Sequence, residues 1–254
     1  MRTEFDQVAH TYDQTFTYTV VGKRQRARVW QYLENILTPE MQILELNGGT
    51  GEDAQFLARK NCEVLLTDVS TEMLRVAQEK CGRSIQVRHL DLTQLEKINL
   101  DTKFDLIFSN FGGLNCLSKQ AMKELDAFAR RHLKEAGELI FVIMPQRNMI
   151  DALYRKFKNL PPLKRSASVP IDVNVGEDTF STYYHNPKDL SLYLDNFELL
   201  HTIPVGFIPS FLSSFISKNG IAARLLNAFD TLLLSLQVLS SRADHFLIHY
   251  EMKS

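Results

Sequence analysis

The stretch Glu45-Leu46-Asn47-Gly48-Gly49-Thr50-Gly51 decides the fold, because it places a glycine cluster between two regular elements. Residues 41–46 before it have the pattern of a short buried strand, and residues 52–60 after it that of a helix. Glycine lets the backbone approach a ligand where a Cβ would clash, and the helix that follows offers free N–H groups at its first turn. Many nucleotide-binding sheets share such a loop, so the neighbouring residues must specify it further.

Strands and helices alternate outward from this loop. Alternation in units of about 30 residues predicts an α/β fold with a parallel sheet covered on both faces. We expect strands over 41–46, 64–67, 85–90, 104–109 and 138–144, with helices over 23–37, 52–60, 71–80 and 118–133. The pattern then loosens into an insertion with a basic helical piece over 146–175, a strand over 179–185, a short helix ending near 196, late strands over 197–203 and 245–251, and an apolar helix over 221–239.

Acidic and amide side chains follow several of the expected strands. Asp68 ends the second strand 17 residues after Gly51, where it could accept hydrogen bonds from both ribose hydroxyls of an adenosine. Asp91 follows the third strand, and Asn110 with Phe111 follows the fourth. These ends meet at the carboxyl edge of a parallel sheet, where ligands of such folds bind. Asp91 could instead cap the turn that begins at Leu92.

With these residues in place, the chain resembles the class I S-adenosylmethionine-dependent methyltransferases. Their first motif is Glu/Asp-x-Gly-x-Gly-x-Gly, and Glu45 to Gly51 matches it except that Asn47 stands where the first glycine normally does. Asparagine tolerates left-handed backbone geometry better than most residues, so we expect the turn to be retained. The resemblance extends to Phe5-Asp6-x-x-Ala9-x-x-Tyr12-Asp13, similar to the N-terminal cap of small-molecule members, and to Leu133-Lys134-x-x-Gly137-Glu138-Leu139, before the fifth strand.

The resemblance implies a Rossmann-like, doubly wound sheet of seven mostly parallel strands, with an antiparallel edge hairpin and helical cap or lid insertions. We expect a single domain over 1–254, divided into cap helices at 1–40, a cofactor-binding core at 41–145, and substrate-side insertions with the edge hairpin at 146–254.

The same resemblance assigns roles to residues of the cofactor site. The glycines would hold the amino-acid end of S-adenosylmethionine, Asp68 its ribose, and residues after the second and third strands its adenine, while Asn110 and Phe111 would face the methionine portion and the methyl. The implied set is Tyr12, Glu45, Asn47, Gly48, Gly49, Gly51, Asp68, Val69, Met73, Asp91, Leu92, Asn110 and Phe111. Glu45 would orient the loop, a role compatible with a purely structural acid, and Tyr12 would close the cofactor from the cap.

The acceptor is expected to be a small, apolar or aromatic metabolite, with O-methylation favoured. Aromatic and aliphatic residues between Tyr183 and Phe215 suit such a ligand. A hydroxyl acceptor benefits from a base, because a phenol with a pKa near 10 is mostly protonated at neutral pH. His185, His245 and His10 are the candidates, and the sequence does not rank them; each could equally be structural.

Charge and composition exclude several other classes. Lys and Arg number 29 against 30 Asp and Glu, and the segment after the fourth strand lacks the paired prolines of base-methylating enzymes, so nucleic acid is not expected as a substrate. The three cysteines show no metal-ligand spacing and suggest no disulfide framework, so we expect no metal and a reducing cytoplasm. A leader peptide and a transmembrane segment are not expected either.

Two other functions compete with methyl transfer. A nicotinamide-dependent oxidoreductase would share the glycine loop, but the late antiparallel hairpin and the Gly-Gly-x-Gly spacing disfavour it. A non-catalytic S-adenosylmethionine-binding or assembly protein would keep the same motifs, and the sequence alone leaves that alternative open.

Three further patterns allow more than one interpretation. The basic run Lys23-Arg24-Gln25-Arg26-Ala27-Arg28 is expected to be a solvated helix face rather than a phosphate-binding one. The stripe Leu225, Phe229, Leu232, Leu236 and Leu239 predicts core packing, with a substrate cover or a membrane-facing surface as the alternative. Residues 204–241 are predicted to form a mobile, largely helical cover over the acceptor site; the apolar side chains behind this prediction are Phe207, Ile208, Phe211, Leu212, Phe215 and Ile216.

Overall fold

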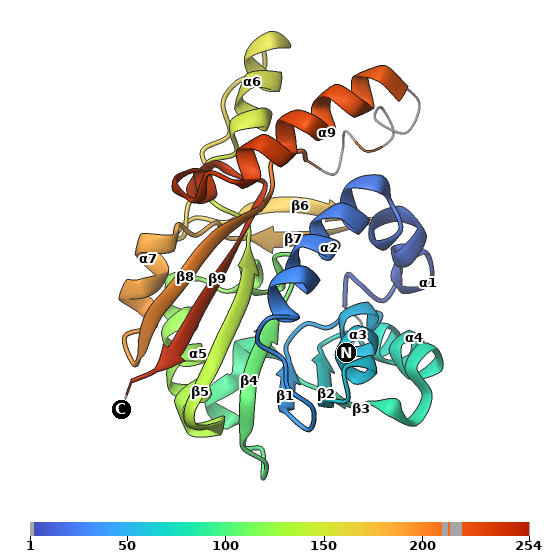
Figure 1. The fold of residues 1–254 in the computed structure, drawn as a ribbon, viewed down its shortest axis with the longest axis vertical. Coiled ribbons are helices and arrows are strands. Elements are labelled where there is room, and N and C mark those ends of the chain that lie inside the picture. Colours follow the sequence, from blue (N-terminus) through green and yellow to red (C-terminus); the bar gives the residue numbers. More distant parts are fainter. Residues whose placement is uncertain (1–2, 210–212, 214–219, 254) are drawn as a thin grey trace.

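Seven strands form the central sheet of the protein, in the order β3-β2-β1-β4-β5-β9-β8 (Figure 1). The computed structural model describes residues 3–209, 213 and 220–253, without the side chains of residues 221–227. The strands of this sheet are β1 Gln42–Glu45, β2 Glu63–Asp68, β3 Gln86–His89, β4 Phe104–Ser109, β5 Leu133–Ile143, β8 Phe197–Gly206 and β9 His245–Met252. The pairs among β1 to β5 are parallel, whereas β9 runs antiparallel to both β5 and β8. The predicted doubly wound sheet and its antiparallel edge are therefore confirmed.

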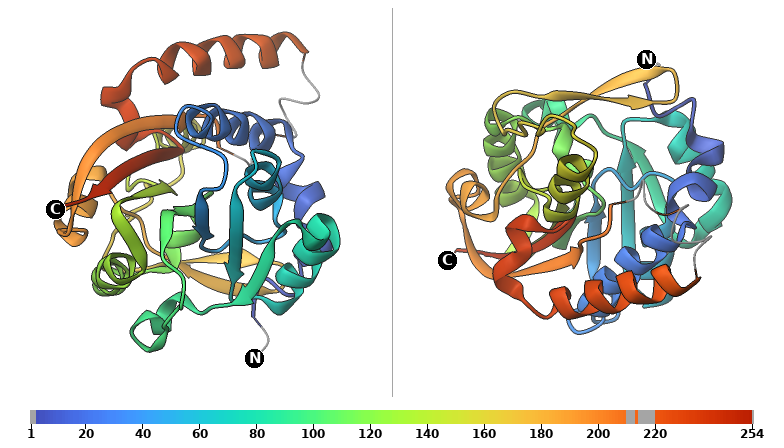
Figure 2. Two further views of the ribbon diagram at one scale, coloured as in Figure 1. Left: turned by 60° about the horizontal axis from the view of Figure 1, so that its bottom comes forward. Right: turned by 90° about the horizontal axis from the view of Figure 1, so that it is seen from above.

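Helices cover both faces of this sheet, as the alternating pattern predicts (Figure 2). Four of them begin at a hydroxyl or amide N-cap whose side chain satisfies a free N–H; for example, Ser70 accepts from Met73 at 3.1 Å, and Ser118 from Ala121 at 3.3 Å. The helices are α1 Ala9–Tyr12, α2 Val20–Leu33, α3 Glu52–Arg59, α4 Thr71–Cys81, α5 Lys119–His132, α6 Met149–Phe157, α7 Pro187–Tyr193 and α9 Gly220–Leu234, and a π-helical turn, Asp13–Thr17, joins α1 to α2.

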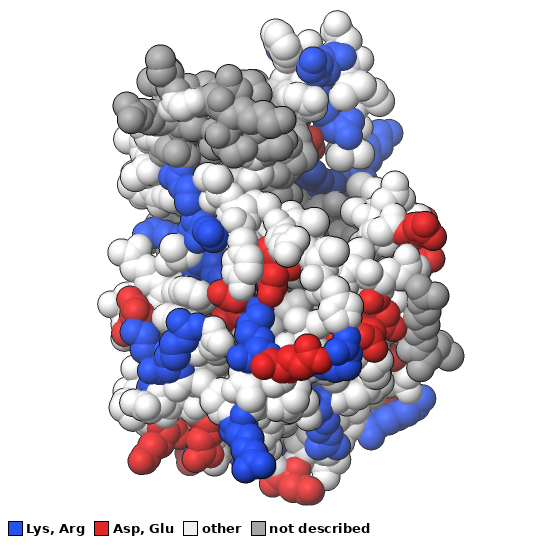
Figure 3. Space-filling model, turned by 90° about the vertical axis from the view of Figure 1, so that its right-hand side faces the viewer, with Lys and Arg blue, Asp and Glu red and all other residues white. Residues whose placement is uncertain are grey.

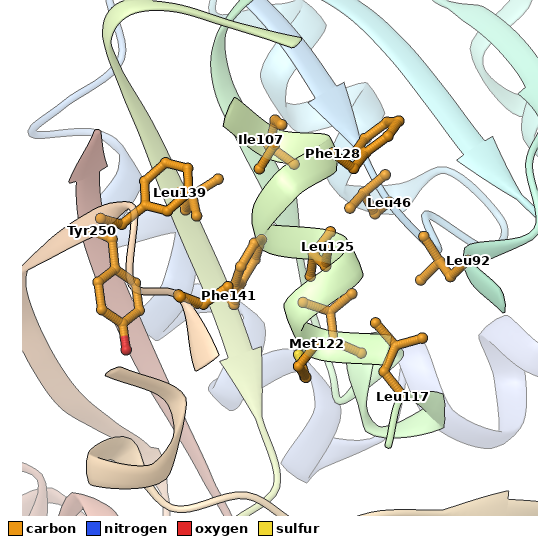
Figure 4. Packing of buried hydrophobic residues seen from close by; sticks show 14 of the residues in the cluster. Leu46, Leu92, Ile107, Leu117, Met122, Leu125, Phe128, Leu139, Phe141 and Tyr250 are labelled. Atoms are coloured by element: carbon orange, nitrogen blue, oxygen red, sulfur yellow. The ribbon is translucent and has the colours of Figure 1, made fainter. Parts of the chain in front are cut away.

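Two hydrophobic clusters fix the layers. Alternate residues of β4 and β5 point to opposite sides, which is the period-two pattern of a strand buried on both faces. One cluster lies between the sheet and α5, and Figure 4 shows Ile107 and Phe141 of the sheet beside Leu125 and Phe128 of the helix. The other cluster joins the opposite face to α2, α3 and α4. The sheet thus holds the carboxyl ends of β1, β2 and β4 rigidly side by side.

Two features differ from the sequence prediction. The sequence predicts a single strand over 179–185, whereas the structure has a separate antiparallel hairpin of β6 Ile171–Val175 and β7 Asp178–Thr182. Its residues are mostly exposed, so the pair lacks the alternation that would mark it in sequence. The predicted cover over 204–241 begins too early, because residues 204–206 belong to β8, with Phe207 and Ile208 buried directly after it. Phe211, Leu212, Phe215 and Ile216 lie outside the described residues.

Candidate functional site

The glycine loop forms the floor of the candidate site between β1 and α3. Asn47, Gly49 and Gly51 all have positive φ, of 52°, 55° and 78°. A Cβ on Gly48 would lie only 2.6 Å from Cγ of Leu66, so this residue must be glycine for the loop to pack on β2. A Cβ on Gly49 would meet nothing within 4 Å. The loop is therefore closed toward the protein and open on the side from which a ligand would approach.

Asn47 adopts the left-handed conformation that its place in the motif predicts. Its side chain also does something the sequence did not reveal, since Nδ2 donates a hydrogen bond to the carbonyl oxygen of Gly113 at 2.5 Å. Gly113 follows β4, so this bond joins the loop after β1 to the loop after β4. The residue thus supplies both the backbone geometry of a glycine and a side-chain link that glycine lacks.

Asp68 lies beneath the same loop at the end of β2. Its two carboxylate oxygens accept hydrogen bonds from the backbone N–H groups of Gly49, at 2.9 Å, and Ser70, at 2.8 Å. Burial raises the pKa of this carboxyl, although the backbone donors act against the shift. Each carboxylate oxygen can accept more than one hydrogen bond, so Asp68 retains the capacity to bind hydroxyl groups.

The four residues expected around the adenine lie at the ends of β2 and β3. Val69 is half-buried and Met73 is buried on α4. Asp91 caps the turn after β3, where its Oδ1 accepts from the N–H of Thr93 at 2.8 Å, so the alternative capping role is present. Leu92 is buried in the core cluster beside α5. Its side chain therefore packs inside the core.

Glu45 carries a buried carboxylate oxygen that has no hydrogen-bond partner among the described residues. Burial raises the pKa of this carboxyl well above its ordinary value, Asp53 raises it further, and Arg26 opposes them. An unsatisfied buried oxygen is costly, so its persistence at the edge of the loop points to a donor that a ligand supplies. The orphaned oxygen and the open space above Gly49 fit the ammonium group and the backbone of an amino-acid ligand, as S-adenosylmethionine would present.

Arg26 is buried, which contradicts the prediction that residues 23–28 form a solvated helix face. Asp53 at the start of α3 accepts hydrogen bonds from Nη1 of Arg26 at 2.5 Å, Nε1 of Trp30 at 2.6 Å and Nδ2 of Asn110 at 3.0 Å. Gln25 is also buried. An ion pair with additional hydrogen bonds makes burial of the charge possible, and the partner is too distant in sequence for the charge pattern to show it. This network fixes Asn110 at the end of β4.

A row of aromatic rings runs from the cap across the site. Tyr12 lies 5.4 Å from Phe16, Phe16 lies 5.1 Å from Phe111, and Phe111 lies 5.9 Å from His245, measured between ring centroids. The guanidinium of Arg26 lies 4.6 Å from the centre of the Phe111 ring. Phe111 has a φ of 49°, rare for a bulky residue and typical of strained positions at functional sites. Sequence reasoning identified the two ends of this row and Phe111, and missed Phe16 and Arg26.

The cap is fastened over the loop by two acids of its motif. Oδ1 of Asp6 accepts from the hydroxyl of Ser70 at 2.6 Å, and the carboxylate of Asp13 binds the hydroxyl of Thr50 at 2.6 Å and Nζ of Lys80 at 2.5 Å. Burial raises the pKa of Asp13, but the hydrogen bonds from Lys80 and Thr50 outweigh it and the net pKa is lowered. Burial raises the pKa of the Tyr12 hydroxyl to about 12. Tyr12 therefore stays neutral at the site.

His245 is the candidate base that the structure brings to this row. Its Nδ1 lies 3.0 Å from Oδ2 of Asp244. Asp244 also accepts hydrogen bonds from Nε2 of Gln25 at 3.0 Å and Nδ2 of Asn148 at 2.7 Å, so its carboxylate is held by α2 and by the N-cap of α6. A carboxylate at Nδ1 fixes the imidazole tautomer and leaves Nε2 to accept a proton.

The other two histidines lie elsewhere. His185 is fully buried, its Nε2 lies 2.9 Å from the carbonyl oxygen of Leu117, and burial lowers its pKa to about 4. His10 is exposed on α1, with Nε2 3.6 Å from a carboxylate oxygen of Glu72. Neither has a described contact with Phe111, so the geometry favours His245.

Comparisons with known proteins agree with this fold. Residues 43–137, which hold the glycine loop, Asp68, Asp91 and Asn110, match the family described as "Methyltransferase domain". The ubiquinone/menaquinone biosynthesis C-methyltransferase UbiE of Cupriavidus metallidurans is 30% identical over 140 residues, 54% of this chain and 56% of that protein. The tRNA 5-carboxymethoxyuridine methyltransferase of Escherichia coli is 27% identical over 41% of this chain and 42% of its own length. The chain thus spans about half the length of these relatives.

A solved structure extends the likeness to the whole fold. The magnesium protoporphyrin IX methyltransferase ChlM of Synechocystis, with bound SAH, superposes with a TM-score of 0.62 over 99% of this chain and 98% of that one, at 14% identity. Residues 43–137 therefore belong to the methyltransferase-domain family, and the chain has the fold of the class I S-adenosylmethionine-dependent methyltransferases. Within the described residues, no helix combines the length and the apolar character needed to cross a membrane.

Proposed function

We propose that this protein transfers the methyl group of S-adenosylmethionine to a small, apolar or aromatic acceptor, with O-methylation favoured. The observation that carries the proposal is the contact between Phe111, at the end of the cofactor-binding strand β4, and His245, which Asp244 orients. Bound S-adenosylmethionine supplies an electrophilic methyl on a sulfonium, and the chain must hold an acceptor in line with it.

The side chains of the site divide the work between binding and proton removal. Glu45 and the open face of Gly49 bind the amino-acid end, Asp68 binds the ribose hydroxyls, and Tyr12 covers the cofactor. Nε2 of His245 would take the hydroxyl proton of the acceptor as its oxygen receives the methyl group, and the Asp244 carboxylate would stabilise the resulting imidazolium.

A cavity beside Asp244 suits an acceptor with an apolar part. It has a volume of about 640 Å³, and its wall includes Asn148, which binds Asp244. Its apolar lining comes mainly from Met149, Leu153, Leu160 and Leu163. Apolar walls with a few convergent polar groups are typical of small-molecule sites. UbiE is named a C-methyltransferase, and the same base would serve a phenolic acceptor methylated on carbon, because that reaction also releases a proton.

Binding of the methyl donor is tested at Asp68. Because both carboxylate oxygens lie under the loop, we expect Asp68→Ala to weaken S-adenosylmethionine binding at least tenfold, about 1.4 kcal/mol, in calorimetry of the folded protein. Asp101→Ala removes an exposed acid before β4 and serves as the matched control. Unchanged affinity in a folded Asp68→Ala protein contradicts the assignment.

The base is tested with a series of phenols of decreasing pKa. His245→Gln and Asp244→Asn should each lower kcat by about 100-fold or more, while S-adenosylmethionine affinity stays within a factor of about two. The loss should shrink for acidic phenols, which are ionised without a base, and a purely structural role would not produce this trend. An equal loss across the series overturns the role of His245, and mass spectrometry of the product distinguishes a methyl ether from a ring methyl.

A further inference from the structure

The helix α6 leaves most of its apolar side chains exposed. Leu153 is 57% exposed and Phe157 83%, and Leu160 beyond the helix is 47% exposed, whereas Asp151 is the only buried residue of α6. A nine-residue helix gains little stability from its own hydrogen bonds and normally relies on packing of an apolar face. An exposed apolar group of this size marks an interaction surface.

The same segment is strongly basic. Residues 147–165 contain six Lys and Arg but one acid, Asp151, in a chain whose net charge is −1. Asp151 pairs with Arg155 at 3.4 Å and Arg165 at 3.0 Å. Lys156, Lys158 and Lys164 are exposed, and none of them forms an ion pair with another described residue. Figure 3 shows blue side chains among white ones at the upper end of the molecule, with most red ones lower down.

The end of α9 adds a second exposed apolar group beside this one. Leu232, Leu236 and Val238 are 65%, 44% and 83% exposed, which contradicts the core packing predicted for two members of the helical stripe. Phe229 of the stripe is also exposed, and the side chain of Leu225 lies outside the described residues. Met149 and Ile150 of α6 pack against a cluster that contains Leu233 of α9, so the two exposed groups are joined. Figures 1 and 2 show α6 and α9 at the same end of the protein.

We propose that these residues form a docking surface for an anionic lipid bilayer. The surface comprises Leu153, Lys156, Phe157, Lys158, Leu160, Lys164, Leu232, Leu236 and Val238. Apolar side chains next to lysines on a short helix fit the boundary between lipid headgroups and acyl chains, where the lysines reach the phosphates and the apolar groups enter the bilayer. A nucleic acid would engage the lysines but would leave Phe157 and Leu153 in water. The proposal goes beyond methyl transfer, and because Leu153 and Leu160 also line the cavity proposed for the acceptor, it is tested by vesicle binding and not by methylation.

The electrostatic part is tested by co-sedimentation of the full chain with vesicles. We expect binding to phosphatidylcholine vesicles that contain phosphatidylglycerol, weaker binding to phosphatidylcholine alone, and release by high salt. The variant Lys156→Gln/Lys158→Gln/Lys164→Gln should lose about fivefold in affinity per charge. The variant Lys97→Gln/Lys103→Gln/Lys123→Gln removes three exposed lysines from other parts of the surface and should bind like the wild type.

Substitution of the apolar side chains of this surface distinguishes a bilayer from a nucleic acid as the partner. Leu153→Ser/Phe157→Ser should lose at least tenfold in vesicle affinity, and Leu192→Ser, which removes a leucine 72% exposed on α7, should not. Equal loss in the Leu192 control, or no binding to anionic vesicles, overturns the proposal. Binding to a transfer RNA that the lysine variant loses and the Leu153/Phe157 variant keeps, without vesicle binding, shows a nucleic-acid surface instead. S-adenosylmethionine binding, measured without vesicles, reports on the proposed function independently.

Discussion

Asn47 shows how far a single residue can be understood from its sequence position. Its place in the loop motif predicts a left-handed backbone, and the φ of 52° confirms it. That prediction needs only the local chain, because the loop geometry follows from adjacent residues. The hydrogen bond from its side chain to Gly113 crosses 66 positions, and no local pattern contains it.

Substitution at Asn47 separates these two contributions. Asn47→Gly keeps the backbone geometry and loses the bond to Gly113, so S-adenosylmethionine affinity should fall only slightly, by about 1 kcal/mol or less. Asn47→Val places a β-branched residue at positive φ and should weaken binding by about 2 kcal/mol or more. Calorimetry on both folded proteins measures the difference. Equal affinities for the Gly and Val variants would show that the position does not require left-handed geometry.

The sequence alone does not show which of the three candidate histidines is the base. His10, His185 and His245 are equivalent in sequence, because each is a histidine near an aromatic or apolar segment. Only their surroundings separate them: an exposed helix for His10, a buried carbonyl for His185, and Asp244 with Phe111 for His245. These neighbours are brought together by the sheet, and their ranking therefore requires the fold.

At the level of elements, periodicity located the central strands and helices to within a few residues. β4 is the clearest example, since a continuous apolar run bounded by polar residues is typical of a strand buried on both faces. Periodicity failed for β6, whose residues are mostly exposed. The helix α2 was predicted, but the solvated face expected over residues 23–28 was wrong, because the pattern of charges does not show that Asp53 neutralises Arg26 inside the protein.

At the scale of the whole molecule, the N-terminal cap contacts the hairpin of β6 and β7, which lies far from it in the sequence. The ring of Phe5 in the cap lies 5.2 Å from that of Phe180 in β7, and Gln7 donates a hydrogen bond to Asp178. The hairpin is held in turn through Asn115, whose carbonyl oxygen accepts from the N–H of Tyr183 at 2.7 Å. The cap and the hairpin therefore meet across the carboxyl edge of the sheet.

Global stability should depend on pH through His185. Its pKa is about 4 in the folded protein and 6.5 in the unfolded chain, so between these values the unfolded state binds more protons. Stability is therefore full above the unfolded value and falls as the pH drops from 6.5 toward 4, by about 3 kcal/mol. Urea unfolding of the wild type and of His185→Gln across this range measures the effect.

The His185→Gln variant keeps all other titrating groups, so the difference between its pH dependence and that of the wild type reports on His185 alone. His185→Gln should be less stable at neutral pH, because the packing and the bond to Leu117 are altered, but its stability should fall less steeply with acid. If the free energy of unfolding fell equally with pH in the two proteins, His185 would have the same pKa in the folded and unfolded states, which would contradict the prediction.

The contacts of Asp244 limit how segments of this protein can be exchanged with those of its relatives. Its carboxylate is held by Gln25 from α2, Asn148 from the start of α6, and its own neighbour His245 at the head of β9. These residues are spread over 220 positions and belong to segments outside the conventional methyltransferase match at 43–137. A chimera that exchanges the cap, the insertion or the last strand with a relative must carry this quartet together. Exchanging one of these segments alone would break hydrogen bonds to Asp244, so the three segments have to be exchanged together.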